Sequence, residues 1–573
     1  MLDRNEIRKT DTNIVTKING KIAALLRGGT SFDPQLGFVL NYGAYIAYES
    51  GISGSEELLE YIERNISEER AMFVKQIAGE NLNISFLLIQ GFDKDAFLLY
   101  MLIFSKDNSS RNFMEFGTPE SLSKLALRIL NIHKKDTVAD FGCGVGDFIT
   151  TATESHHMKS IFGIDINTYS CEISKIRSEL FAENAEIVLG DMFSLSKDMT
   201  FDKIFSNYPF GLRRLHIQAG EEYIEKLYKR MPEIMKATSS DWFFNSLIVD
   251  HLNENGKAVA IMTNGSTWNS IDQKIREHFI KNGLIESIIL LPARLFEFTN
   301  ISTTMIVLSR NNDFVRMIDA TEICEQGRRQ NYLTDSNIKK IVRLLTEDGD
   351  EAITIDVGKL KENDYVLNPS RYLTKTVKIE DGVQFGSLMR RITRGAPLKA
   401  SVLDEMVSED PTDTQYLMLA DIKNGMIAEE LPYLKELDSK LDKYCIQNRN
   451  LLLSKNGAPF KVAVAEVEAG RKLLGNGNLF IIELDEVRVN PYYIKAFFDS
   501  EAGTAALNSI VVGASIPNIS AESLKKLIVP LPPMEKQNEI ANLYQAKQDE
   551  IKVLELKIQR AQNDLRGIFG EVE

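Results

Sequence analysis

The sequence predicts a multidomain α/β protein with a doubly wound, Rossmann-like domain in its first half. Three observations support this prediction. The chain has 573 residues, which is too long for a single hydrophobic core. Between residues 116 and 310, short β-rich runs alternate with helical segments, the pattern of a mostly parallel sheet covered by helices. The parts before and after follow other patterns, so we expect separate domains there.

Residues 1–115 predict an N-terminal helical domain, because apolar residues recur at helical spacing, as in "GSEELLEYIERNI" (54–66). The most apolar segment, residues 84–104, is interrupted by "DKD" and is too short on either side to cross a bilayer. We therefore expect a buried helix pair and no membrane association. The opening residues "MLDRNEIRKT" also lack the apolar core of a secretory signal.

The remaining elements follow in order along the chain. The strands of the predicted sheet are expected at residues 136–141, 159–165, 185–191, 201–207, 257–263, 285–292 and 302–310. Residues 311–375 predict a helical and irregular connector that ends the first half. Residues 376–533 mix short strands and turns, which indicates a smaller α+β domain. Residues 534–573 predict one long helix of the coiled-coil type.

Composition narrows the functional classes. A hydrophobic fraction of 44% and a charged fraction of 26% are typical of a globular protein. The formal net charge of −14 is not that of a nucleic-acid binder, so a nucleic-acid site would need a local basic face. The four cysteines show no metal or redox spacing, which predicts reduced thiols, a cytoplasmic protein and no metal site.

A strand, a glycine-rich turn and a helix are predicted at "TVADFGCGVGDF" (137–148). Gly142, Gly144 and Gly146 would let the backbone turn tightly and approach a ligand closely. The pattern is D-x-G-x-G-x-G, with Asp140 before the first glycine, and differs from the GxGxxG of NAD-binding proteins. A tight β–α turn without a ligand is the alternative.

Two further acids support a ligand at this turn. Asp165 ends the next predicted strand, where a carboxylate can accept hydrogen bonds from both ribose hydroxyls of a nucleoside. Asp191 ends the third strand, where it can accept from an adenine amine. Each acid alone is typical of a helix N-cap. Together with Asp140 they would line one crevice and suit a nucleoside with a cationic tail, and S-adenosyl-L-methionine is such a ligand.

The fourth strand is followed by "NYPF" (207–210). The exocyclic amine of adenine is a poor nucleophile, so a catalyst must accept hydrogen bonds from both of its N–H groups. The side-chain oxygen of Asn207 and the backbone carbonyl of Tyr208 can accept them, in a turn that Pro209 rigidifies. Phe210 would offer a face for a flipped-out base. An Asx-type turn would use the Asn and the Pro but does not need the aromatic ring. We expect direct methyl transfer to the positioned amine, without a covalent enzyme intermediate.

The order D-x-x-C-G-x-G, G-D and N-x-P-F resembles the amino-group DNA methyltransferases, and more closely the modification subunits of type I restriction–modification systems. "FGTPESLSKLALRIL", which begins at Phe116, is similar to the Phe-x-Thr-Pro motif of that family. Residues 276–310 and 362–373 are similar to its second half and its ending, so the resemblance covers most of residues 1–375. It implies an adenine-specific DNA methyltransferase that uses S-adenosyl-L-methionine, with Thr118 near the methionine end of the cofactor.

One residue departs from the family pattern. Tyr208 stands where the family usually has the first Pro of Asn-Pro-Pro-Phe or Asn-Pro-Pro-Tyr. A tyrosine still supplies a carbonyl, but its ring either narrows the pocket or adds a stacking surface. A catalytically weakened DNA-binding protein and a methyltransferase acting on RNA or a protein amide stay open as alternatives. An NAD-dependent oxidoreductase is disfavoured, because it has no use for this glycine spacing or for residues 207–210.

Residues from 376 onward resemble the specificity subunit of the same systems. The similar segments are residues 448–464, 477–485, 489–498 and 513–540. The resemblance implies one target-recognition domain that binds double-stranded DNA. Basic side chains that can contact phosphates or base edges are Arg390, Arg391, Arg394, Lys399, Lys455, Lys461, Arg471 and Lys472. An ordinary solvated surface is the alternative for each of them.

The terminal helix carries an apolar stripe with one charged interruption. Its members recur at spacings of four and three, at Ile540, Tyr544, Lys547, Ile551, Leu554, Ile558, Ala561, Leu565 and Ile568. Packing against the rest of the chain is one explanation. Because the specificity family pairs two long helices between two recognition domains, we expect a homodimer through this helix that reads an inverted-repeat target. A separate restriction subunit, or an additional specificity subunit, is a further partner that the resemblance implies.

Overall fold

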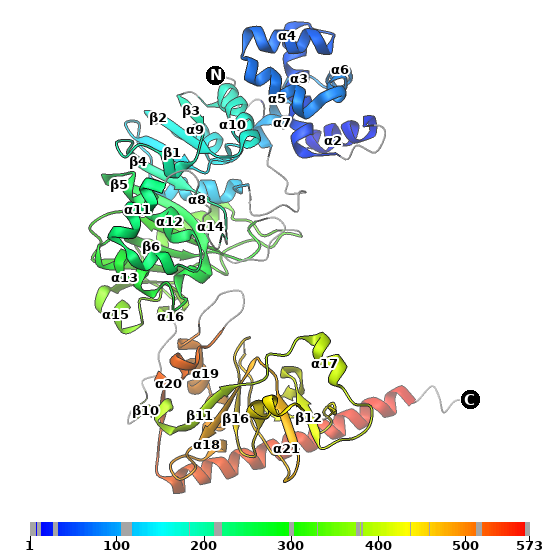
Figure 1. The fold of residues 1–573 in the computed structure, drawn as a ribbon, viewed down its shortest axis with the longest axis vertical. Coiled ribbons are helices and arrows are strands. Elements are labelled where there is room, and N and C mark those ends of the chain that lie inside the picture. The colour runs from blue at the N-terminus through cyan, green and yellow to red at the C-terminus, as the bar shows by residue number, and fades with distance from the viewer. Residues whose placement is uncertain are drawn as a thin grey trace. The chain divides into compact units, whose positions relative to one another are not determined.

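A computed structural model gives the fold of the chain (Figure 1). It describes residues 7, 13–26, 32–104, 117–182, 184–210, 212, 221–296, 303–328, 330–373, 379, 382–435, 437–457, 459–511 and 518–567. The chain forms two compact units, Met1–Pro369 and Ser370–Glu573. Each unit is described by itself below.

The first unit begins with helices, as the sequence predicts. They are α2 (Ile14–Leu25), α3 (Pro34–Ser50), α4 (Ser55–Asn65), α5 (Glu68–Ala78), α6 (Ile84–Ile89) and α7 (Lys94–Ile103). Polar caps begin several of them: Asp33, Ser67 and Asp93 each accept a backbone N–H of the first turn of α3, α5 and α7. The apolar segment at residues 84–104 is therefore two short helices, and no helix in the described ranges is long and apolar enough to cross a membrane.

A nine-stranded mixed sheet follows. Its strands are β1 (Thr137–Phe141), β2 (Ser160–Asp165), β3 (Ala185–Leu189), β4 (Phe201–Ser206), β5 (Leu252–Thr263), β6 (Ile285–Leu290), β7 (Thr303–Leu308), β8 (Phe314–Asp319) and β9 (Ala352–Asp356). The spatial order is β3-β2-β1-β4-β5-β7-β6-β8-β9, and the first five of these strands run parallel. β7 pairs antiparallel with both β5 and β6. All seven predicted strands are present, and the expected methyltransferase-like α/β architecture is confirmed.

The helices of this unit fall into two groups, as expected for a doubly wound sheet. They are α8 (Glu120–Leu130), α9 (Asp147–Ser155), α10 (Thr168–Phe181), α11 (Glu221–Arg230), α12 (Asp241–Asp250), α13 (Gln273–Lys281), α14 (Asp335–Leu344) and α15 (Val357–Glu362). One group consists of α14, α8, α9 and α10, each of which contacts the next. In the other group, α11 and α13 both contact the 3-10 turn at Pro232–Lys236. α10 packs on β2 and β3 and also contacts α5 and α7.

The sequence predicts a helical and irregular connector at residues 311–375. In the structure, β8 and β9 extend the sheet there. Arg316 explains the difference. It interrupts the apolar run of β8, yet its side chain is buried and donates hydrogen bonds to the Leu344 carbonyl and the Thr354 hydroxyl. A charge in the middle of a strand is compatible with the sheet only with such partners, and these lie 28 and 38 residues away.

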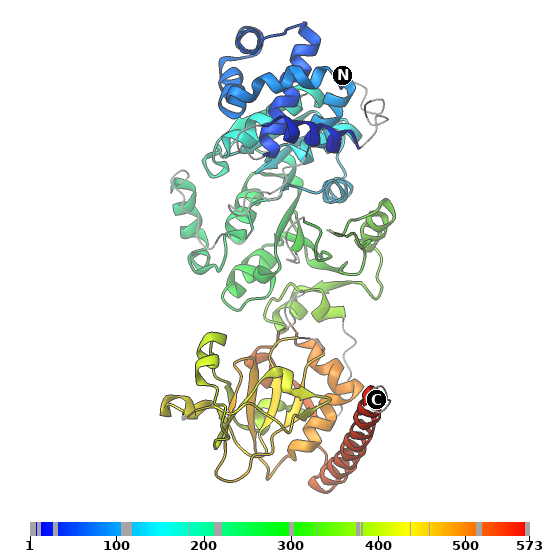
Figure 2. The same ribbon diagram turned by 90° about the vertical axis from the view of Figure 1, so that its right-hand side faces the viewer.

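The second unit has the short strands and turns that the sequence predicts (Figures 1 and 2). Its helices are α16 (Ser370–Leu373), α17 (Ala400–Met406), α18 (Pro491–Asp499), α19 (Glu501–Ser509), α20 (Ala521–Lys526) and α21 (Met534–Gly567). Its strands are β10 (Gly382–Gln384), β11 (Met389–Arg394), β12 (Thr414–Leu417), β13 (Ile422–Lys423), β14 (Met426–Ile427), β15 (Cys445–Ile446), β16 (Leu451–Ser454), β17 (Val462–Val464), β18 (Lys472–Gly475), β19 (Leu479–Leu484) and β20 (Ile528–Pro530). The main sheets have the orders β11-β19-β16-β17 and β12-β18-β15.

Candidate active site

The ends of four parallel strands bring the predicted site residues together. β1 pairs with β2 on one side and with β4 on the other, and β2 also pairs with β3. Because parallel strands end at the same edge of a sheet, Asp140, Asp165 and Asn207 lie at one edge. Asp191 follows β3 at the same edge. The structure therefore gathers the residues that the sequence assigns to the cofactor and to the reacting amine.

The glycine-rich turn after β1 needs its glycines. Gly142, Gly144 and Gly146 all have positive φ, at 76°, 53° and 83°. At Gly146 a Cβ would also lie 2.7 Å from the Ser174 hydroxyl. The N–H of Gly144 donates to Asp165 Oδ2 at 2.8 Å, so the carboxylate at the end of β2 braces the turn.

The turn carries several carboxylates in close proximity. Asp140 is buried, and its burial together with Asp165 and Asp147 raises its pKa well above the usual range. Burial also raises the pKa of Asp147, while the Arg177 guanidinium acts in the opposite direction. Burial raises the pKa of Asp191, which also caps a 3-10 turn by accepting from the Phe193 N–H at 2.9 Å. Carboxylates that burial makes unfavourable as anions suit a ligand that brings positive charge.

Asp147 was not singled out from the sequence. It is the first residue of α9, where an acid is ordinary because it complements the helix dipole. The structure gives it more specific surroundings: Arg177 donates to it at 2.8 Å, and the backbone N–H of Thr118 lies close enough to lower the pKa of its carboxyl group. Its position beside the glycine turn is the signal that could have identified it.

Asn207 and Thr118 are in direct contact. Asn207 Nδ2 donates to Thr118 Oγ1 at 3.0 Å, although 89 residues separate them in the sequence. Thr118 therefore lies between the predicted catalytic amide and the glycine turn. Phe116, the first residue of the predicted Phe-x-Thr-Pro motif, lies outside the described residues.

Tyr208 packs into the protein. It is only 1% exposed, and its ring stacks on Phe244 of α12 with ring centroids 4.6 Å apart. Its hydroxyl lies 3.4 Å from Asn245 Oδ1, and burial raises its pKa well above the usual range. In this conformation the ring neither narrows the pocket nor offers an exposed stacking surface, the two roles considered from the sequence. The backbone carbonyl of Tyr208 remains part of the turn at residues 207–210.

Phe210 differs from the expectation of an open stacking face. It is 4% exposed and meets Phe296 edge to face, with ring centroids 5.2 Å apart. Burial of both rings is favourable and explains the covered conformation. Phe296 was missed by the sequence analysis, because it follows β6 and nothing in its local pattern distinguishes it from a core residue.

Two apolar side chains flank the acids at the strand ends. Ile166 directly follows Asp165 and is 71% exposed, and Leu189 at the end of β3 is 47% exposed. Exposed aliphatic side chains next to carboxylates are features of a pocket for a flat, partly polar ligand. A single apolar residue after an acid has no periodicity, so the sequence did not indicate either one.

The predicted DNA-contacting residues lie in the second unit and differ in the partners that they contact. Arg390 forms an ion pair with Asp485 at 2.8 Å, and Lys461 donates to the Leu419 carbonyl. Arg394, at the end of β11, donates to the Gly477 carbonyl. Lys455 lies near it, because its backbone N–H donates to the carbonyl of Asn478, the neighbour of Gly477. Burial and then the charge of Arg394 lower the pKa of Lys455. Arg391 is exposed on β11, and Lys399 is exposed just before α17. Arg471 and Lys472 pair with Glu468 and Asp442.

Amide side chains surround the pair of Arg394 and Lys455. Asn456 Nδ2 donates to Asn478 Oδ1 at 3.2 Å, and Asn518 donates to Asn456. The Lys455 N–H donates to the Asn478 carbonyl at 2.7 Å. The sequence did not reveal this group, because Asn456 lies 22 and 62 residues from its two amide partners.

Comparison with known proteins agrees with this arrangement. Residues 96–381 match the family described as N-6 DNA methylase, and residues 408–559 match the family described as type I restriction modification DNA specificity domain. The type I restriction enzyme MjaIX methylase subunit of Methanocaldococcus jannaschii is 28% identical over 307 residues, which cover 48% of this chain and 54% of that subunit. The MpnII methylase subunit of Mycoplasma pneumoniae is 24% identical over 310 residues, 49% of this chain and 57% of that subunit.

The chain spans about half the length of these curated relatives. Among solved structures, the type I restriction-modification system methyltransferase subunit from Streptococcus thermophilus aligns with a TM-score of 0.47 and 21% identity, over 63% of this chain and 85% of that chain. The two family matches assign residues 96–381 to the N-6 DNA methylase family and residues 408–559 to the family of type I restriction modification DNA specificity domains.

Proposed function

We propose that this chain is a sequence-specific DNA adenine-N6 methyltransferase of a restriction–modification system, with its own recognition domain. The observation that carries the proposal is the Asn207–Phe210 turn, which follows β4 next to the acidic glycine turn. The two family matches, one for methylation of adenine in DNA and one for DNA specificity, support the same activity. The four cysteines, all free thiols, fit the cytoplasmic location expected of such an enzyme.

The residues at the strand ends fit S-adenosyl-L-methionine as the methyl donor. The three left-handed glycines keep side chains away from the turn, and the buried Asp140 favours a ligand with positive charge. We assign Asp140, Gly142, Gly144 and Gly146 to its methionine part, with Thr118 nearby. Asp165 would accept from the ribose hydroxyls and Asp191 from the adenine amine, beside Ile166 and Leu189. When bound, this cofactor supplies an electrophilic methyl group on a sulfonium.

The turn after β4 would hold the reacting amine. The Asn207 amide oxygen and the Tyr208 carbonyl would accept its two N–H groups, which keeps the nitrogen lone pair available for the methyl carbon. Pro209 restricts the turn that presents these acceptors. A flipped base would contact Phe210, and entry of the base requires a change in the contact between Phe210 and Phe296.

The second unit would bind double-stranded DNA through Arg394 and Lys455. These two cations lie together, and in the described part of the chain neither of them pairs with a carboxylate. Cations beside asparagine side chains are suited to phosphates and to base edges. Arg390, Arg391 and Lys461 are proposed as further contacts, although Arg390 must first exchange Asp485 for a phosphate. Asn456 and Asn478 would read bases.

The terminal helix would join two copies of the chain. Lys552 pairs with Glu429 and Glu555 accepts from Asn424, so one side of α21 is held against its own unit. Ile551, Leu554 and Ile558 lie about a quarter turn away and are 46%, 50% and 58% exposed. A second copy that packs this stripe against its own would bury both. A restriction subunit or an additional specificity subunit is the further partner that we propose on the basis of the related subunits.

Expression in a host that lacks adenine methylation tests the function. Genome-wide mapping should find N6-methyladenine at one recurrent sequence, and the Asn207→Ala variant should give none while it still binds the cofactor. A transfer assay with labelled cofactor on DNA and on RNA separates the alternatives. Labelled RNA with unlabelled DNA would overturn the substrate assignment, and DNA binding without any methylation would indicate the weakened DNA-binding protein.

A further inference from the structure

A series of buried and partly buried polar contacts connects the helical domain with the amide of Asn207. We propose that this series of contacts, which runs from the Leu102 carbonyl through Arg177, Asp147 and Thr118, orients the Asn207 amide for methyl transfer. Thr118 is then a positioning residue, acting through Asn207. The expected effect of Thr118 on the methylation rate rests on the proposed function. Its expected effect on the orientation of the amide rests on the contacts alone.

The first contact sets the direction of the amide. Asn207 Nδ2 donates to Thr118 Oγ1 at 3.0 Å, so the nitrogen is the end that faces Thr118. The amide oxygen is therefore turned to the opposite side of the group. If the amide were reversed, its NH2 would face the amine of the target base, and two donors cannot hydrogen-bond each other. The Thr118 hydroxyl accepts from the amide nitrogen in this orientation, which leaves the amide oxygen of Asn207 to accept from the amine of the base.

The second contact fixes Thr118 itself. Its backbone N–H lies close enough to the Asp147 carboxylate to lower the pKa of that group. Thr118 also precedes Pro119, which restricts the backbone of Thr118 to extended conformations, and Pro119 is the N-cap residue of α8. The hydroxyl of Thr118 is therefore held in position from its backbone, and it does not depend on a flexible loop.

The third contact connects Asp147 with the helical domain. Arg177 is 3% exposed at its side chain and donates to Asp147 Oδ1 at 2.8 Å. The same nitrogen donates to the Val145 carbonyl in the glycine turn at 2.7 Å, and the other terminal nitrogen donates to the Leu102 carbonyl of α7 at 3.1 Å. A buried guanidinium needs such partners, since its desolvation is costly. One side chain therefore joins the helical domain, the glycine turn and the support of Thr118.

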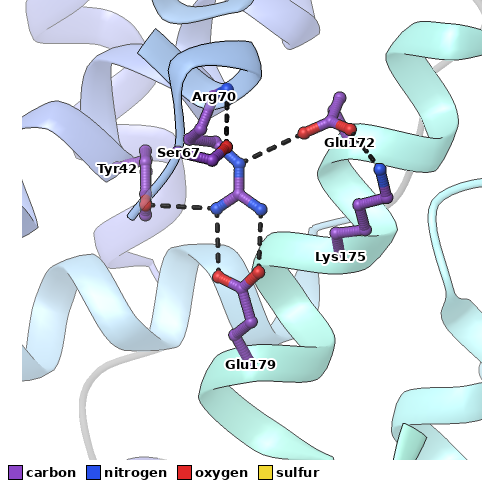
Figure 3. Close-up of polar contacts among 6 residues, drawn as sticks. All are labelled: Tyr42, Ser67, Arg70, Glu172, Lys175 and Glu179. Atoms are coloured by element: carbon purple, nitrogen blue, oxygen red, sulfur yellow. Dashed lines mark hydrogen bonds and ion pairs between the residues drawn. The ribbon is translucent and has the colours of Figure 1, made fainter. Parts of the chain in front are cut away.

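The helix that carries Arg177 is clamped by the helical domain (Figure 3). Arg70 of α5 donates to Glu172 at 3.2 Å and to both oxygens of Glu179 at 3.0 and 2.9 Å. A further donation reaches the Tyr42 hydroxyl at 3.2 Å. Glu172 and Glu179 lie two turns apart on one face of α10 and bracket Arg177 in the sequence. The helical domain thereby determines where α10, and with it Arg177, stands.

The test replaces the Thr118 hydroxyl without changing the size of the side chain. Thr118→Val removes the hydroxyl and keeps the backbone N–H for Asp147, and Thr118→Ser retains the hydroxyl. Thr153→Val is the matched control, because its hydroxyl donates to the Ile149 and Thr150 carbonyls of α9 at 3.0 and 3.2 Å and to the Phe181 carbonyl at the end of α10 at 3.5 Å. The single-turnover methylation rate at saturating cofactor should fall about 10- to 100-fold in Thr118→Val, since small misplacements of a catalytic group have effects of this size. Thr118→Ser should recover most of that loss.

Cofactor affinity and the amide resonance complete the test. The dissociation constant for S-adenosyl-L-methionine, measured by calorimetry, should change less than about threefold in Thr118→Val. With asparagine-selective 15N labelling, the Asn207 side-chain signal should shift in Thr118→Val and stay in place in Thr153→Val. A rate at saturating cofactor within twofold of the unmodified protein, or a loss confined to cofactor affinity, would overturn the inference.

These outcomes also separate the inference from the proposed function. If the unmodified protein methylates no nucleic acid, the proposed function fails, and the Asn207 resonance alone decides whether Thr118 orients the amide. An unchanged resonance then overturns the inference as well. If the unmodified protein methylates DNA and Thr118→Val matches it, only the inference fails.

Discussion

At the residue scale, Asp140 illustrates a conflict between stability and cofactor binding. Its pKa is raised in the folded chain, first by burial and then by Asp165 and Asp147. A raised acid pKa means that the folded state binds the proton more tightly than the unfolded state, so stability is lost as the pH rises above the usual value near 4. Asp140→Asn should therefore raise the free energy of unfolding at pH 7, by about 0.5–2 kcal/mol. The gain should disappear below about pH 4, as measured by thermal denaturation across that range.

The same substitution should weaken cofactor binding, because the amide has no charge to complement the sulfonium or the ammonium group. In the unmodified chain, affinity for the cofactor should rise with pH as Asp140 loses its proton, and in Asp140→Asn this part of the pH dependence should be absent. Asp198→Asn, at an exposed position, serves as the control. Lower stability at pH 7 together with unchanged affinity would contradict both statements.

Phe210 allows a separate test of base stacking. Its ring is covered by Phe296, so a stacked base must take the place of that contact. Phe210→Leu should weaken the complex with the flipped base about tenfold, since stacking on an aromatic ring contributes about 1–3 kcal/mol per base. Fluorescence of 2-aminopurine at the target position measures this. Phe148→Leu is the control, because Phe148 is equally buried and stacks on Phe205 in the core. Equal effects of the two variants would exclude a stacking role.

The sequence could predict which residues stand at the strand ends and could not predict their partners. Asp140, Asp165 and Asn207 follow from strand periodicity, because a parallel sheet collects its carboxyl ends at one edge. The burial of Tyr208 could not be predicted, because its partner, Phe244, comes from a helix 36 residues further along. Spacing in the sequence does not determine which ring covers which.

At the scale of elements, α10 should depend on its clamp to the helical domain. Glu179 is 54% exposed, whereas its partner Arg70 is 3% exposed, so removal of the carboxylate leaves a buried cation with fewer partners. Glu179→Gln should destabilise α10 by about 1–2 kcal/mol, a value discounted because Glu179 is half exposed to solvent. Hydrogen exchange of the α10 amides should accelerate correspondingly.

A matched control for this prediction is Glu60→Gln. Glu60 pairs with Arg64 on α4, and both side chains are well exposed, at 62% and 76%. Such surface pairs contribute little, so protection of the α4 amides should hardly change. If Glu179→Gln were as silent as Glu60→Gln, the clamp would not hold α10.

Elements were predictable where local pattern and burial agree. β4, at Phe201–Ser206, lies within the predicted run 201–207, because its apolar residues Phe201, Ile204 and Phe205 are all buried in the sheet. β8 was not predictable, because Arg316 breaks the apolar pattern and its compensating partners are distant in the sequence. A charged side chain is tolerated in the interior of a strand where specific partners accept or donate its hydrogen bonds.

At the scale of the whole molecule, the helical domain is not a separate body. Its hydrophobic core includes Ile173, Ile176 and Phe181 of α10, and residues 1–369 form one compact unit. The sequence pattern indicated a boundary near residue 115, where apolar residues at helical spacing give way to short β-rich runs. A shared core is a property of the packed chain, and it explains how the helical domain can influence the glycine turn.

DNA recognition by the second unit should depend on Arg394 more than on Arg390. Arg390 already has a carboxylate partner, Asp485, whereas Arg394 contacts a backbone carbonyl and lies beside Lys455. Arg394→Ala should weaken binding to all DNA sequences and reduce the slope of log K against log salt by about 1. Arg390→Ala is the matched control and should change the slope less. Equal slopes for the two variants, from fluorescence anisotropy at several salt concentrations, would contradict this assignment.

The assembly should depend on the exposed stripe of α21. The early part of the helix is covered by its own unit, where Gln537 and Ala541 are buried against α18. Further along, Ile551, Leu554 and Ile558 are exposed, and their spacing of three and four matches a two-helix seam. Light scattering should therefore find twice the chain mass of 64.7 kDa. Ile551→Glu with Leu554→Glu should give the single-chain mass, because charges cannot be buried in such a seam without partners.

Lys557→Glu controls for added negative charge on the same helix, and it should leave the mass unchanged. The cofactor affinity of the double variant should equal that of the unmodified protein, since the catalytic residues belong to the other unit. DNA with two half-sites should then be bound more weakly, because each chain presents one recognition domain and the gain from joining two is lost. A single-chain mass for the unmodified protein, both free and on DNA, would remove the role of α21 in assembly and leave the stripe to a different partner subunit.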